Sequence, residues 1–161
     1  MNGKCLVVFY SRTGRTREVA EGISKALRCD TEEIKEAGSR KGVLGFLRSG
    51  FEAYLKRLPS INEPGHDPSS YDLVVIGTPT WASNISSPVR AYMSRYRARF
   101  KKSAFFRTGF SENEKVFKDM EALCGKKPIR TLSVTNKESA DEALLGKKLA
   151  EFAAELAESL K

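Results

Sequence analysis

The sequence predicts an α/β fold in which one parallel sheet of five strands carries helices on both of its faces. Short apolar runs alternate with amphipathic segments along nearly the whole chain. The apolar runs are continuous and rich in β-branched residues, which is typical of strands buried on both sides. Strands that alternate with helices in this way form parallel sheets with right-handed crossovers. The length of 161 residues suits one domain with one core, over residues 1–161.

The first part of the chain is predicted to contain two strand-helix units. Residues 5–9 form a buried strand, and residues 18–28 form an amphipathic helix with apolar residues on one face. Residues 31–35 are charged and suit a strand at a sheet edge, where charge discourages unwanted pairing. Residues 42–58 have apolar side chains at three- and four-residue steps, which predicts a second helix. A loop rich in Pro, Gly and Ser follows over residues 59–70.

The middle of the chain predicts two further buried strands, over residues 72–77 and 103–107. Between them, Ser87 is predicted as the N-cap of a helix and Pro88 as its first helical residue. This helix is expected to extend to about residue 99.

The last part of the chain contains two Ser-x-x-Glu patterns, each of which predicts a capping box before a helix. Ser111 with Glu114 precedes a helix to residue 123, and Ser139 with Glu142 precedes a helix through residue 160. Residues 129–135 form the strand between them.

Residues 11–16, which read SRTGRT, join the first strand to its helix. A helix N-terminus carries unpaired N–H groups and roughly half a positive charge, so it suits a phosphate. The hydroxyl groups in this loop can add hydrogen bonds, and Gly14 permits close approach of the backbone. Ligands bind such sheets at the carboxyl ends of the strands, so the loops after the first, third and fourth strands are the expected binding region.

The motifs of two other kinds of phosphate-binding loop are absent from the chain. The chain contains neither G-x-x-x-x-G-K-[ST] nor G-x-G-x-x-G, which disfavours a P-loop nucleoside triphosphatase and a dinucleotide-binding fold. On this loop alone, a helix capped by hydroxyl side chains without any ligand remains open.

Three segments together extend the interpretation. Residues 11–16 match the pattern [ST]-x-T-G-x-T, residues 77–80 read GTPT and lead to Trp81, and residues 87–93 read SPVRAYM. In this combination the chain resembles the flavodoxin family. The resemblance implies a doubly wound three-layer sandwich with strand order 2-1-3-4-5, which would bind one FMN non-covalently.

The resemblance also implies which residues hold the cofactor. The first loop would bind the phosphate, Trp81 would stack on the flavin ring, and the loop after the fourth strand would complete the site. The implied FMN-binding residues are Ser11, Arg12, Thr13, Gly14, Arg15, Thr16, Pro79, Thr80, Trp81, Ala82, Ser83, Asn84, Thr108, Gly109 and Phe110. No catalytic side chain is expected, because the redox chemistry belongs to the flavin.

A metal site is not expected, because the three cysteines are widely spaced and the chain has one histidine, His66, in a turn-rich loop. The cysteines are interpreted as reduced thiols of a cytoplasmic protein. The N-terminus does not resemble a signal peptide, and no run of 18 apolar residues predicts a membrane span.

The net charge of +8 suggests an acidic partner. Arg12 and Arg15, together with Arg40 and Lys41, are predicted to form a basic rim that faces an acidic redox partner protein or a small anionic substrate. Residues 90–107 contain seven basic and no acidic side chains, but most are expected at the far end of the sheet. Nucleic acid is disfavoured because no recognition motif accompanies the charge.

Electron transfer through FMN to a protein partner is the favoured function. One alternative is an FMN-dependent NAD(P)H or quinone reductase, with a homodimer interface on residues 42–58 that includes Leu44 and Phe46. The second alternative is a docking or regulatory module that keeps the fold without flavin.

Overall fold

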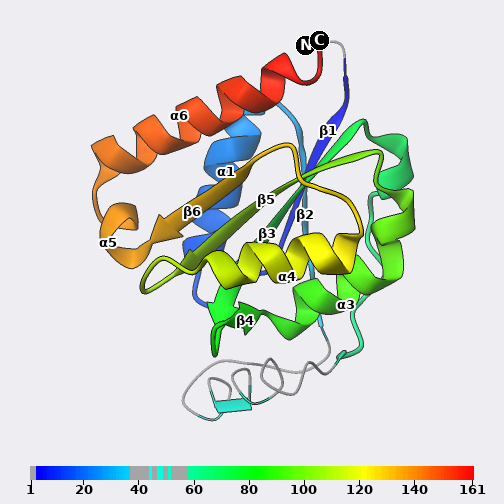
Figure 1. Cartoon of the computed structure of the whole chain (residues 1–161), viewed down its shortest axis with the longest axis vertical. Coiled ribbons are helices and arrows are strands. Elements are labelled where there is room, and N and C mark those ends of the chain that lie inside the picture. The colour runs from blue at the N-terminus through cyan, green and yellow to red at the C-terminus, as the bar shows by residue number, and fades with distance from the viewer. Residues whose placement is uncertain (1–2, 37–43, 45–46, 49–50, 52–57) are drawn as a thin grey trace.

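The computed structural model describes residues 3–36, 44, 47–48, 51 and 58–161, and these form a parallel sheet between two layers of helices (Figure 1). The sheet has the strand order β2-β1-β3-β5-β6. Its strands are β1 (Cys5–Phe9), β2 (Asp30–Glu33), β3 (Leu73–Trp81), β5 (Lys102–Gly109) and β6 (Thr131–Thr135). All neighbouring pairs along this path are parallel. Counted along this path, the predicted order 2-1-3-4-5 is confirmed, and the sheet differs from the prediction by a sixth short strand, β4 (Asn84–Ile85), which pairs with β3 off the path.

Helices cover both faces of the sheet, as predicted. In Figure 1, α1 (Arg15–Leu27) and α6 (Glu142–Glu158) lie together on one face, and α3 (Ser87–Tyr96) and α4 (Glu114–Cys124) lie on the other. A short helix, α5 (Asn136–Ser139), follows β6, and two 3₁₀ turns occupy Pro68–Ser70 and Arg97–Arg99. The predicted helix over residues 42–58, with its expected dimer interface, lies mostly outside the described residues, as do Arg40 and Lys41.

The core consists of two apolar layers separated by the sheet. In β1, Leu6 and Val8 face the layer beneath α3 and α4, whereas Val7 and Phe9 face the layer beneath α1 and α6. This alternation follows from the two-residue period of a strand. The edge strand β2 is partly exposed and acidic, as its composition predicts. Cys5 is buried in β1, and none of the three cysteines forms a disulfide.

Gly77 lies where β3 passes closely beside β5. A Cβ atom at residue 77 would lie 1.9 Å from Cζ of Phe106, and this phenylalanine is fully buried. The pairing of β3 with β5 at this point therefore requires a residue without a side chain.

Two of the predicted helix caps are wrong. The N-cap of α3 is Ser86 rather than Ser87, and its backbone N–H donates to Oγ1 of Thr78 at 3.0 Å. The box predicted from Ser111 does not form, and α4 begins after Asn113. The reason is that β5 extends to Gly109, so the residues after it are needed to turn the chain before the helix can start.

The last predicted cap is also wrong, because the sequence contains an additional short helix. Thr135 and Glu138 form the capping box of α5. Asp141, rather than Ser139, caps α6 and accepts a hydrogen bond from the backbone N–H of Leu144 at 3.0 Å.

We expect Glu138→Gln to lower the free energy of unfolding by about 1 kcal/mol at neutral pH. Glu138 accepts a hydrogen bond from the Thr135 N–H at 2.8 Å and pairs with Lys148 Nζ at 2.8 Å. Burial opposes its ionisation, but Lys148 and Thr135 together hold the pKa of Glu138 below its ordinary value of 4.5. This stabilisation is therefore complete above the unfolded-state pKa and is lost as the pH falls through the lower folded-state pKa.

Urea unfolding of the parent and Glu138→Gln over a pH series tests this expectation. The two curves should differ at neutral pH and converge in acid. A difference that stays constant across the series would contradict the role of the carboxylate charge.

None of the helices in the described part of the chain has the length and apolar character that a membrane crossing requires.

Candidate functional site

Two adjoining cavities lie at the carboxyl ends of the parallel strands. The first has a volume of about 420 Å³ and the second about 220 Å³. They share Thr80, Trp81 and Phe110, so they form one continuous depression. The other residues of the first cavity are Arg12, Thr13, Arg15, Thr16, Pro79, Thr108, Gly109 and Asn136. The second is completed by Ala82, Ser83, Arg107, Ser111 and Asn113.

The loop after β1 forms one end of the first cavity. Gly14, the N-cap of α1, has a φ of 104°, a conformation that favours glycine. Its N–H donates to Oγ of Ser11 at 3.0 Å, which closes the turn. Gly14 has no side chain with which to cap the helix, so α1 begins at the cavity without a side-chain hydrogen bond from its N-cap residue.

Both arginines of this loop line the first cavity together with Thr13 and Thr16. Thr16 is buried, and its Oγ1 lies 2.8 Å from Oγ1 of Thr108 at the end of β5. This bond joins the first loop to the opposite wall of the site. The cavity therefore has one end that combines a helix N-terminus, two guanidinium groups and hydroxyl side chains.

Part of the second cavity is formed by a hairpin that the sequence did not predict. The short strand β4 (Asn84–Ile85) pairs antiparallel with the end of β3, with Trp81 opposite Asn84. Trp81 is thus the last residue of β3 rather than a loop residue. Its side chain is largely buried and packs edge-on against Tyr10, with ring centroids 5.4 Å apart.

The two residues of the hairpin turn are strained. Ala82 has a φ of 45° and Ser83 a φ of 58°, and neither is a glycine. Two-residue hairpins of this kind favour Asn-Gly because both central residues need a positive φ. Ala82 and Ser83 line the second cavity, so the strain is located at the candidate site.

We expect the double substitution Ala82→Asn with Ser83→Gly to raise the free energy of unfolding of the ligand-free protein by about 1–2 kcal/mol. Thermal unfolding measures this change. Ser83→Ala, which keeps a non-glycine residue at a positive φ, is the control and should give no increase. A double variant no more stable than this control would contradict the assignment of strain to the turn.

Arg107 is a residue of the site that the sequence did not identify. It belongs to the basic segment 90–107, yet its side chain is only 1% exposed. Nε donates to Oγ1 of Thr80 at 2.9 Å, and Nη1 donates to Oγ of Ser133 at 2.9 Å. Burial lowers the pKa of Arg107, but a guanidinium keeps its proton in proteins.

The other six basic residues of segment 90–107 line neither cavity, and three of them pair with acidic residues from elsewhere in the chain. Arg95 pairs with Glu63, and Arg99 lies 3.3 Å from a carboxylate oxygen of Asp67. Lys101 pairs with Asp72, with Nζ 3.1 Å from a carboxylate oxygen. Lys101 directly precedes β5, at the edge of the sheet opposite the cavities. The excess of positive charge in this segment of the sequence is therefore partly balanced in the fold by carboxylates from other segments.

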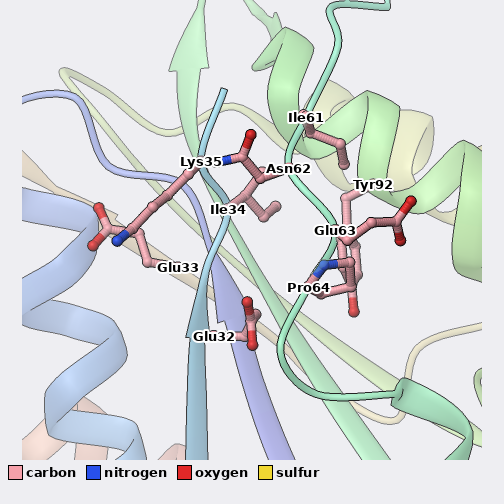
Figure 2. A pocket seen from close by; sticks show the side chains of 9 residues that line it. All are labelled: Glu32, Glu33, Ile34, Lys35, Ile61, Asn62, Glu63, Pro64 and Tyr92. Atoms are coloured by element: carbon pink, nitrogen blue, oxygen red, sulfur yellow. The ribbon is translucent and has the colours of Figure 1, made fainter. Parts of the chain in front are cut away.

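A separate pocket of about 170 Å³ lies between β2 and residues 61–64 (Figure 2). It shares no lining residue with the two cavities. Glu32 is already bound to the His66 ring at 2.7 Å, and Glu63 accepts from the Tyr96 hydroxyl at 2.9 Å. The sole histidine thus has a structural partner. No group of three or more possible metal ligands occurs within the residues that the structure describes.

No family model and no curated protein matches this chain. Solved structures of other proteins do match it. The chain matches a flavoprotein in complex with FMN from Lactobacillus acidophilus with a TM-score of 0.71 and 22% identity, over 81% of this chain and 93% of that one. It matches oxidised flavodoxin 1 from Bacillus cereus with a TM-score of 0.59 and 19% identity, over 98% and 99% of the two chains.

The chain has the flavodoxin-like fold. A flavodoxin-like structure described as a WrbA-like protein from Agrobacterium tumefaciens gives a TM-score of 0.62 at 15% identity, with 99% of each chain covered. At these identities the likeness concerns the fold alone. It confirms the resemblance in fold that the three sequence segments suggested.

The flavodoxin-like fold brings most of the predicted site residues together. Ser11, Gly14 and Asn84 line neither cavity: the first two shape the turn, and Asn84 donates to the Ala82 carbonyl oxygen at 2.6 Å. The lining residues that were not predicted are Arg107, Ser111, Asn113 and Asn136. Asn136 directly follows β6 at the same edge of the sheet, so its position after a strand could have predicted it as a site residue.

Proposed function

We propose that this flavodoxin-like chain binds one FMN in the two adjoining cavities and transfers electrons through it to a protein partner with an acidic face. The observation that carries the proposal is the arrangement of one continuous depression, with an anion-binding end at α1 and aromatic residues beside the opposite wall. FMN has the matching form, a phosphate at one end and a flat ring at the other.

The phosphate end fits this loop on three grounds. The N-cap of α1 is a glycine, which makes no side-chain cap, and a helix N-terminus of this kind suits an anion. Arg12 and Arg15 line the cavity and supply positive charge. Gly14 holds the turn in a conformation that allows a ligand to approach the backbone.

The ring end fits the remainder of the depression. Trp81 and Phe110 line both cavities, and Phe110 is 87% exposed. Covering such a side chain with a flat ring removes apolar surface from water, and stacking contributes about 1–3 kcal/mol in comparable sites. The flavoprotein from Lactobacillus acidophilus, crystallised with FMN, adds support from a protein of the same fold.

When bound, FMN would supply the redox chemistry, and this chain's residues would hold and orient it. The chain's net charge of +8 supports an acidic partner, because opposite charges accelerate encounter. Partner binding would accordingly weaken as salt is added.

Titration of the flavin-free protein into FMN, followed by flavin fluorescence, tests the proposal. Saturable one-to-one quenching is expected, with riboflavin binding much more weakly because it lacks the phosphate. No binding of FMN would overturn the proposal and would favour the flavin-free docking module.

The reductase alternative is tested on the same complex. We expect NADPH alone to leave the bound flavin oxidised over many minutes under anaerobic conditions, because a carrier receives its electrons from a protein. Rapid bleaching of the flavin absorbance by NADPH would contradict the carrier function and would favour an FMN-dependent reductase.

A further inference from the structure

We propose that Arg107 makes the site bind reduced FMN more tightly than oxidised FMN, and thereby raises the reduction potential of the bound cofactor. The inference rests on the proposed function. It concerns a buried cation at the ring end of the site, distinct from the half-buried Arg12 and the exposed Arg15 at the phosphate end.

The guanidinium of Arg107 is held rigidly at the second cavity. Thr80 and Ser133 accept hydrogen bonds from Nε and Nη1, each at 2.9 Å. The remaining nitrogen, Nη2, donates no hydrogen bond to any residue in the described part of the chain. It lies against Gly109, where a Cβ atom would be 2.3 Å from it. Glycine at residue 109 therefore leaves room for the guanidinium beside the cavity.

Glu112, Glu114 and Glu138 act on the charge of Arg107, but only Glu112 lies within ion-pair distance of it. The nearest ion-pair partner is Glu112, whose carboxylate lies 3.9 Å from Nη1 and is 60% exposed to solvent. A buried charge without a close, desolvated counter-charge is unfavourable. A ligand that brings negative charge into the second cavity would improve this balance.

Flavin chemistry supplies that negative charge on reduction. The oxidised ring is neutral, and uptake of two electrons and one proton gives a ring with one negative charge. A fixed cation beside the ring therefore favours the reduced form more than the oxidised form. By linkage, a tenfold change in the ratio of the two affinities equals about 30 mV for a two-electron couple.

The experiment compares Arg107→Gln and Arg107→Lys with the parent protein. Affinity for oxidised FMN is measured by fluorescence, and the midpoint potential by anaerobic dithionite titration against a reference dye. We expect Arg107→Gln to lower the ratio of reduced to oxidised affinity at least tenfold, or about 30 mV, and Arg107→Lys to retain most of it. Arg90→Gln is the matched control, since Arg90 is also buried but lines neither cavity.

A second variant keeps the test independent of the folding of Arg107→Gln. Glu112→Gln removes the exposed counter-charge and should raise the affinity ratio about threefold, whereas Glu121→Gln, near the far end of α4, should leave it unchanged. An unchanged ratio in both Arg107→Gln and Glu112→Gln overturns the inference and leaves the FMN proposal intact. Failure of the parent protein to bind FMN overturns the proposed function itself.

Discussion

Thr13→Asp is expected to weaken FMN binding about 100-fold while changing riboflavin binding by no more than about threefold. Thr13 is exposed, lines the first cavity and lies in the turn just before α1. A carboxylate there would be close to the phosphate of a bound FMN, and repulsion between two such charges near a surface is a few kcal/mol. Riboflavin carries no phosphate, so it should be insensitive to the new charge.

Thr13→Asn is the matched control, because asparagine has the shape of aspartate without its charge. Fluorescence titrations with both flavins should show near-parental FMN binding for Thr13→Asn. Equal weakening of FMN and riboflavin by Thr13→Asp would mean that this loop does not hold the phosphate.

Gly77→Ala is expected to lower the free energy of unfolding by about 3 kcal/mol or more. The added methyl group would overlap the ring of Phe106, with three ring carbons at 1.9, 2.3 and 2.4 Å. The ring is fully buried in the core layer beneath α1 and α6, so it has little space into which to move. Relief would require a shift of β5 relative to β3.

The control is Gly146→Ala in α6, where no atom lies within 4 Å of the added Cβ. This change should stabilise the protein by about 0.5–1 kcal/mol, because alanine favours a helix over glycine. Chemical denaturation measures both variants. Phe106→Leu in the Gly77→Ala background should recover part of the loss. A Gly77→Ala protein as stable as its parent would contradict the described packing of β3 on β5.

The strand pattern of the chain could be predicted because hydrophobic periodicity decides it. Each buried strand is a continuous apolar run, and its neighbours along the chain are amphipathic helices. The helix ends were less predictable, because several Ser, Thr, Asn and Asp residues compete for each cap. Near β6, Thr135 and Asp141 cap two helices where the sequence suggested one cap at Ser139.

The site could be located because loops at the carboxyl ends of parallel strands converge. The buried cation of the site could not be predicted, since Arg107 lies within a run of basic residues whose other members mostly face solvent or acidic partners. Its hydrogen-bond acceptors in the fold are Thr80 and Ser133, which are distant in sequence. The hairpin after β3 was missed for a different reason: Ala82 and Ser83 are not typical residues for the positive φ that the turn demands.

An amide chemical-shift titration with FMN tests the central claim most directly, because it reports both binding and location. The claim predicts large, saturable shifts at the backbone N–H groups of residues 12–16, 80–83 and 108–110, and small shifts around the pocket of Figure 2. Shifts confined to other surfaces, or none at saturating FMN, would contradict it.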